Sequence, residues 1–158
     1  MADEKKILAK KAFDLVRTAL DERKWVYNTD EENLHFDFKV SGDDLPMQMI
    51  IRIDDERQLI RVFSMLPFDM AEEKRIEGAI AVCVANCGMV DGGFDYNLND
   101  GSILFRNVAT YRDSDLSATL VQYLISVCCS TVDKYNDRFL MLSKGMLSLE
   151  DFIQKDKA

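Results

Sequence analysis

The sequence predicts an α+β domain in which a twisted antiparallel sheet packs on helices. Three observations lead to this prediction. Residues 33–66 form three runs in which apolar and polar side chains alternate, residues 92–108 repeat the pattern as a hairpin, and one amphipathic helix separates the two blocks. An apolar side chain at every second position places one face of a strand against a core. The predicted order is helix, three strands, helix, two strands, helix.

Composition favours a single folded domain, residues 1–158, with a hydrophobic core. Of the 158 residues, 47% are apolar, which is enough for a core and too many for a disordered chain. Twenty-eight acidic side chains face 20 lysines and arginines, so the formal net charge is −8. Such a chain repels phosphate backbones and anionic lipid surfaces. Neither nucleic acid nor a membrane is therefore an expected partner.

The first residues and the cysteines favour a cytoplasmic protein. Met1–Lys6 is charged and polar with no apolar stretch behind it, so no signal peptide is predicted, and no apolar run has the length of a membrane span. The four cysteines form two close pairs, Cys83 with Cys87 and Cys128 with Cys129, and neither pair has the spacing of a common zinc site. We expect them to be reduced and buried as small hydrophobic side chains.

The period of the apolar residues predicts where the first elements lie. Recurrence at helical spacing predicts a helix over residues 4–23. Alternation then predicts strands over 34–40, 46–53 and 58–66, separated by clusters of turn-forming residues.

The second half of the sequence predicts a helix, a hairpin and a long helix. The second helix opens at Asp69 and ends at Gly88, and the hairpin turns at Asp100-Gly101. A long helix runs from about Ser114 to Leu142, and Ser148 caps a short last helix over 149–154. The residues of the second helix that are expected to be buried form one stripe, which consists of Ile76, Ile80, Cys83, Val84 and Cys87.

The third strand, residues 58–66, is apolar on both faces. Such a strand is usually central in its sheet and covered on both sides. The helices of this chain can provide one cover. The second cover is either another helix of the chain or a second copy in a homodimer, and the pattern leaves both open. This strand and its neighbour are the expected partner-binding surface. Its candidate residues are Ile60, Val62, Leu66, Met47 and Met49.

No constellation in the sequence points to catalysis, a metal or a cofactor. A single histidine, His35, excludes a two-histidine metal site, and there is no nucleophile-elbow, phosphate-loop or dinucleotide motif. The acidic clusters at 43–44, 54–56 and 113–115 lack the spacing of a calcium loop and are expected to be solvated turns. Asn86 is expected to hydrogen-bond the second helix to the hairpin. We therefore predict a protein that is not an enzyme, with no catalytic, metal or cofactor-binding residues.

The order of the elements and a set of dispersed residues resemble the YbjN-like family of bacterial sensory transduction regulators. The fold of that family resembles the type III secretion chaperones. The matching positions are spread along nearly the whole chain and are residues that set the fold. They are Trp25, Phe36, Phe38, the segment 61–67 (Arg-Val-Phe-Ser-Met-Leu-Pro), Glu72–Arg75, Asn86, Gly93–Tyr96, Asp100-Gly101, Asp133, Tyr135 and Gly145. The resemblance implies a chaperone-like or regulatory role and carries no catalytic residue.

Three hypotheses for function follow. The preferred one is a cytoplasmic, non-enzymatic module, chaperone-like or regulatory, that binds a protein or peptide partner. Eight methionines would give an adaptable apolar surface, and a sheet edge could accept an added strand. The alternatives are a small-molecule-sensing regulator and an uncharacterised enzyme. Either alternative needs a convergent polar pocket, which the spacing of the residues does not provide.

Overall fold

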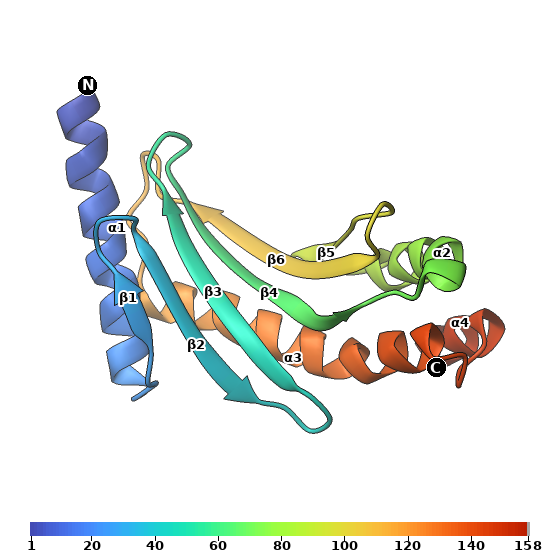
Figure 1. Cartoon of the computed structure of the whole chain (residues 1–158). Coiled ribbons are helices and arrows are strands. Elements are labelled where there is room, and N and C mark those ends of the chain that lie inside the picture. Colours follow the sequence, from blue (N-terminus) through green and yellow to red (C-terminus); the bar gives the residue numbers. More distant parts are fainter. Residues whose placement is uncertain (158) are drawn as a thin grey trace.

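The computed structural model describes residues 1–157, and these form an α+β fold with one six-stranded antiparallel sheet (Figure 1). Across the sheet the strands follow the order β1-β2-β3-β4-β6-β5. The strands are β1 (Asn28–Asp30), β2 (His35–Ser41), β3 (Pro46–Asp54), β4 (Leu59–Asp69), β5 (Gly93–Tyr96) and β6 (Ser102–Thr110). The helices are α1 (Ala2–Glu22), the short 3₁₀ helix η1 (Glu72–Lys74), α2 (Arg75–Asn86), α3 (Ala118–Ser143) and α4 (Leu149–Lys157). The predicted fold class is confirmed.

The helices form a layer on one face of the sheet. In Figure 1, α3 runs behind β3, β4 and β6, and it contacts α1 near its beginning and α4 at its end. Helices α2 and α4 pack on each other beyond β5. No described helix lies over the front face of β3, β4 and β6. The sheet therefore has one covered and one open face.

The core lies between the sheet and α1 with α3. Phe36, Ile51 and Val62 are neighbours across β2, β3 and β4, and their side chains are fully buried. On α3, Ile125 and Phe139 are equally inaccessible to solvent. Burying a side chain of this size stabilises a fold by about 1.5–3 kcal/mol. The apolar positions of the alternating strands are therefore the ones that pack against the helices.

An aromatic cluster joins the hairpin to the two C-terminal helices. The ring of Phe94 on β5 meets the rings of Tyr135 and Phe139 on α3 edge-on, with centroids 5.6 and 5.3 Å apart. Phe152 on α4 lies 5.3 Å from Phe139. Such pairs contribute about 0.5–1.5 kcal/mol beyond the burial of their area. They fix α4 and the hairpin on the same end of α3.

Two strand boundaries differ from the prediction. Alternation does not predict β1, because Asn28–Asp30 carries no apolar side chain and joins the sheet by backbone pairing with β2. β4 continues through Pro67 to Asp69, where the sequence predicts the end of the strand and the start of a helix. The register against β6 shifts between Met65 and Asp69. A bulge of this kind accommodates a proline, which has no N–H to donate.

The start of α3 is also later than predicted, whereas the cap of α4 is as expected. The Oγ of Ser117 accepts the N–H of Leu120 at 3.1 Å and caps α3. Ser114, the predicted first residue, instead donates its hydroxyl to the carbonyl of Thr110. At α4 the Oγ of Ser148 accepts the N–H of Asp151 at 3.1 Å. Two serines three residues apart offer the same capping pattern, so tertiary contacts decide between them.

The predicted buried stripe of α2 is wrong at four of its five positions, and Val84 alone of the five is partly buried against the core. Ile76 and Ile80 are 66% and 43% exposed, and the thiols of Cys83 and Cys87 also lie on the surface. The buried residues of α2 are small: they are Gly78, Ala81, Val82 and Ala85. At Gly78 an added Cβ would lie 2.8 Å from the side chains of Met70 and Tyr96. Close approach of the helix therefore selects its small face, and the larger apolar face points outward.

The cysteines are correspondingly not all buried. Cys128 is buried in α3 and Cys129 is partly buried, whereas Cys83 in α2 and Cys87, the residue that follows α2, are exposed. Burial raises the pKa of the Cys128 thiol well above its ordinary range, and it raises that of Cys129 to about 11. The two α3 thiols are therefore protonated and unreactive in the folded chain.

Candidate protein-binding surfaces

The five residues predicted to form a partner-binding surface lie in the core. Ile60, Val62 and Met49 are fully buried, and Leu66 and Met47 are 4% exposed. The physical reason is that β4 turns this face, and not the one with Phe63, toward the helices. Central placement of β4 agrees with the prediction, but these side chains offer no exposed surface in the described chain. Ile60 alone of the five reaches the floor of the groove described next.

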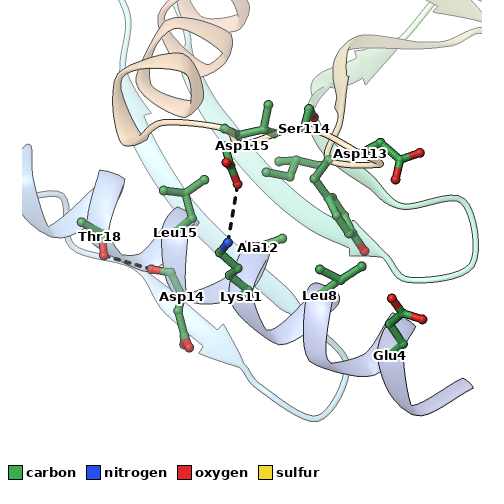
Figure 2. A pocket seen from close by; sticks show the side chains of 13 residues that line it. Glu4, Leu8, Lys11, Ala12, Asp14, Leu15, Thr18, Asp113, Ser114 and Asp115 are labelled. Carbon is green, nitrogen blue, oxygen red and sulfur yellow. Dashed lines mark hydrogen bonds and ion pairs between the residues drawn. The ribbon is translucent and has the colours of Figure 1, made fainter. Parts of the chain in front are cut away.

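A groove runs between α1 and the segment that leads from β6 to α3 (Figure 2). Its volume is about 610 Å³. Leu8, Ala12 and Leu15 on successive turns of α1 form one wall, and Leu116 belongs to the opposite wall. Leu8, Ala12 and Leu15 share one stripe of the predicted first helix. The stripe is wide enough that one edge of it packs in the core and the other edge lines the groove.

The rim of the groove is acidic. Glu4 and Asp14 border it on α1, and Asp113 and Asp115 border it on the facing segment. The basic side chain on this rim is Lys11, whose Nζ lies 3.6 Å from Asp115 across the groove (Figure 2). Both partners of that pair are largely exposed, so the pair is weak and easily replaced. An apolar floor between carboxylates suits a ligand with an apolar anchor and basic flanks.

The segment facing α1 is held firmly by its own hydrogen bonds. Tyr111 donates its N–H to the carbonyl of Gln58 at 3.0 Å, and its hydroxyl donates to the carbonyl of Asp54 at 3.3 Å. Burial raises the pKa of Tyr111 to about 12. Asp113 adopts a positive φ of 50° in the turn that follows. The acidic cluster 113–115, predicted to be only a solvated turn, thereby becomes part of the groove's rim.

A second exposed feature is the outer stripe of α2. Ile76, Ile80, Cys83 and Cys87 follow one another at intervals of four, three and four residues and all lie on the surface. This alternation of threes and fours is the spacing at which one helix packs against another. The opposite side of α2 already packs on β5 and α4. The stripe therefore has no cover within residues 1–157.

Residues 1–157 contain no cluster of three or more His, Cys, Asp or Glu side chains that could hold a metal ion. His35 lies on β2, away from the groove, and its Nδ1 accepts the Nε–H of Arg52 at 3.3 Å. None of the helices in this part of the chain is both long and apolar enough to cross a membrane. The amide oxygen and nitrogen of Asn86 both form hydrogen bonds with the backbone of Phe94. The sequence predicts such a contact for a residue that joins the helix to the hairpin.

Comparison with known proteins gives a fold and no family. No family model matches the chain, and no curated protein matches it. Among solved structures it is similar to a chain in the structure of the HopA1–SchA chaperone–effector complex, with a TM-score of 0.51 and 12% sequence identity. The match covers 78% of this chain and 91% of that chain. The α+β fold is confirmed by this match, whereas a chaperone-like role and membership of the YbjN-like family stay predictions.

Proposed function

We propose that this chain is a non-enzymatic, chaperone-like module that binds a segment of another protein in the groove along α1. The observation that carries the proposal is the groove itself, which has a volume of about 610 Å³, an apolar floor and an acidic rim. The similarity to a chain of a chaperone–effector complex supports the same class of function. We extend the proposal to a single YbjN-like domain over residues 1–158 that acts in the cytoplasm as a chaperone or regulator.

The charge of the rim defines the partner's chemistry. Four carboxylates surround the floor, and Lys11 offsets one of them. A bound segment should place leucine, phenylalanine or methionine on Leu8 and Leu15, with lysine or arginine next to it. The basic groups would displace Lys11 from Asp115, which costs little because that pair is exposed. Binding should weaken as salt is added, because exposed charges are screened.

Selection from a random peptide library on the full chain tests the proposal. The expected peptides combine a large apolar residue with flanking basic ones. The double variant Asp113→Asn/Asp115→Asn should weaken their binding about five- to tenfold, since each rim charge contributes up to about 1 kcal/mol. The matched control Asp3→Asn/Asp151→Asn removes two exposed carboxylates that do not line the groove. Peptides without basic residues, or equal losses in both variants, would contradict the proposal.

The outer stripe of α2 favours a second proposal, a homodimer through this helix. A stripe with spacing of four, three and four is complementary to a copy of itself. Small side chains at Ala79 and Cys83 beside Ile76 and Ile80 let two helices approach closely. In an antiparallel pair centred on the stripe, Ile80 of one protomer would face Cys83 of its partner.

Light scattering across a range of concentrations tests the homodimer. Ile80→Glu should shift the equilibrium to monomer, because it places a charge in the apolar seam. The control is Ile7→Glu, which changes another exposed isoleucine, 69% accessible and outside the stripe. A chain that stays monomeric at every concentration, or dimers unaffected by Ile80→Glu, would exclude this interface.

A further inference from the structure

The open face of the sheet carries three arginines around one aromatic ring. Its central residues are Ile50 and Arg52 on β3, Arg61, Phe63 and Met65 on β4, and Arg106 on β6. Phe63 pairs with Ile50 on one side and with Arg106 on the other. We call these six residues the arginine face. The alternating burial of the strands places these side chains on the face opposite the core. Figure 1 shows α3 behind β3, β4 and β6 and no helix in front of them.

Two of the arginines are placed in a way that the fold itself does not favour. Arg52 and Arg61 pair directly with each other across β3 and β4. Like charges directly opposite each other destabilise a sheet. The two guanidinium carbons lie 5.9 and 6.0 Å from the centroid of the Phe63 ring, so both cations gather over the same side chain. In a chain with a net charge of −8, two cations in this position need another explanation.

No carboxylate of residues 1–157 forms an ion pair with these two arginines. The hydrogen bond of the Arg52 Nε–H is to His35. Asp54, two residues further along β3, is engaged by the backbone and side chain of Arg57, and the charge of Arg61 makes only the smallest contribution to the lowering of its pKa. By contrast, Arg106 is held in a bidentate pair by Asp95, at 2.6 and 3.1 Å. The positive charge of Arg52 and Arg61 is therefore available to a ligand.

We propose that the arginine face binds an acidic segment of a partner protein, with a carboxylate between Arg52 and Arg61. Guanidinium groups bind carboxylates through paired, charge-assisted hydrogen bonds. The adjoining apolar side chains complete the site. Met65 is 46% exposed, and Ile50 and Phe63 are half-buried, so an aliphatic or aromatic residue next to the carboxylate would find apolar contact.

A protein segment fits this face better than a nucleic acid does. Binding a phosphate backbone depends on many cations along its path, and the rest of the chain is strongly acidic. A sheet that binds single strands stacks successive bases on several aromatic rings. The arginine face has one ring, and the two cations already lie against it. This site is independent of the α1 groove and has the opposite charge.

Fluorescence anisotropy on the full chain tests the inference with three labelled probes. The first is a short peptide of glutamate, leucine and phenylalanine, the second is the same peptide with glutamine for every glutamate, and the third is an oligothymidylate. The acidic peptide should bind most tightly, and its affinity should fall as salt is added. Arg52→Gln/Arg61→Gln should weaken it by about tenfold or more. The control Arg23→Gln removes an exposed arginine outside the face and should leave binding unchanged.

Two further measurements keep the outcome clear. Because the double variant removes a like-charge pair, its melting temperature should equal or exceed that of the parent chain, which separates lost binding from lost folding. The groove variant Asp113→Asn/Asp115→Asn should bind the acidic peptide as the parent does. Equal binding of the glutamine peptide, preferential binding of the oligothymidylate, or an undiminished affinity in Arg52→Gln/Arg61→Gln would overturn the inference.

Discussion

Asn86 at the end of α2 pairs with the backbone of Phe94 on β5 as if it were a strand residue. Its Oδ1 accepts the N–H of Phe94 at 2.8 Å, and its Nδ2 donates to the carbonyl of the same residue at 2.9 Å. The contact joins the helix to the first strand of the hairpin across the glycine-containing turn. Both backbone groups of Phe94 lose their partners if the amide is removed.

Asn86→Ala is therefore expected to destabilise the fold by about 2 kcal/mol, since it leaves partly buried polar groups unpaired. Urea unfolding followed by circular dichroism measures the change. The control Asn28→Ala removes an amide that bonds an exposed carboxylate, Asp37, and should cost about 0.5 kcal/mol or less. Equal losses of unfolding free energy in the two variants would show that the helix–hairpin contact stabilises the fold no more than an exposed hydrogen bond does.

Gly101 should tolerate no side chain, whereas Gly88 should tolerate one at a modest cost. Both have a positive φ, 78° and 84°. A Cβ on Gly101 would lie 2.4 Å from the carbonyl oxygen of Met70, but at Gly88 it would meet nothing within 4 Å. We expect Gly88→Ala to cost about 1 kcal/mol from backbone strain alone and Gly101→Ala about 3 kcal/mol or more. Thermal unfolding of the pair separates the two contributions.

The stability of the fold should fall when the pH rises above about 10. Burial raises the pKa of Tyr111 and of Tyr135 to about 12, and a hydrogen bond to Asp156 adds to the shift of Tyr135. Unfolded tyrosine loses its proton near pH 10, so between about 10 and 12 the folded chain holds protons that the unfolded chain releases. This contribution is complete below pH 10 and is lost as the pH approaches 12.

Ultraviolet titration of tyrosinate, combined with unfolding at each pH, checks this behaviour. All five tyrosines have raised pKa values in the folded chain, and Tyr111 and Tyr135 should ionise last. Tyr135→Phe should lower stability at neutral pH, because Asp156 loses its partner, and should make the alkaline decline shallower. An alkaline slope that is the same in this variant would refute the assignment.

Two of the four thiols should react rapidly with a disulfide reagent in the native state. Cys83 and Cys87 are exposed on α2, while the buried Cys128 and partly buried Cys129 have raised pKa values. The variant Cys83→Ser/Cys87→Ser should lose the fast phase entirely. Rapid reaction of more than two thiols would mean that α3 opens readily. If α2 pairs with a second copy, the fast phase should slow with rising protein concentration.

The sequence predicts most strands because alternation reports directly which side chains face a core. It predicts the outer face of α2 incorrectly for a physical reason. Ile76 and Ile80 are its most apolar positions, yet packing on Met70 and Tyr96 requires the small face with Gly78. Steric fit between elements is not visible in the hydrophobic pattern of one helix.

The candidate sites were harder to predict than the fold, since each combines residues distant in sequence. Leu8 and Leu15 carry the same helical signal as the core residues around them, and only the tertiary arrangement brings the 113–116 segment opposite them. Apolarity on both faces of residues 58–66 predicts a central strand, and β4 is central in the sheet. The side facing solvent is the one with Phe63, and its arginines give no distinctive signal in the sequence because cations on an exposed strand are common.

The position of α3 along the chain determines when the apolar face of the sheet can be covered during synthesis. Residues 118–143 are the main cover of β4 and β6, and they follow all six strands. Until they emerge, nascent strands present Met49, Val62 and Phe105 to the surroundings with little more than α1 to shield them. Exposed apolar strands are prone to association. The order of the elements thus leaves a stage in synthesis at which all six strands have been made but the helix that covers the sheet is still missing.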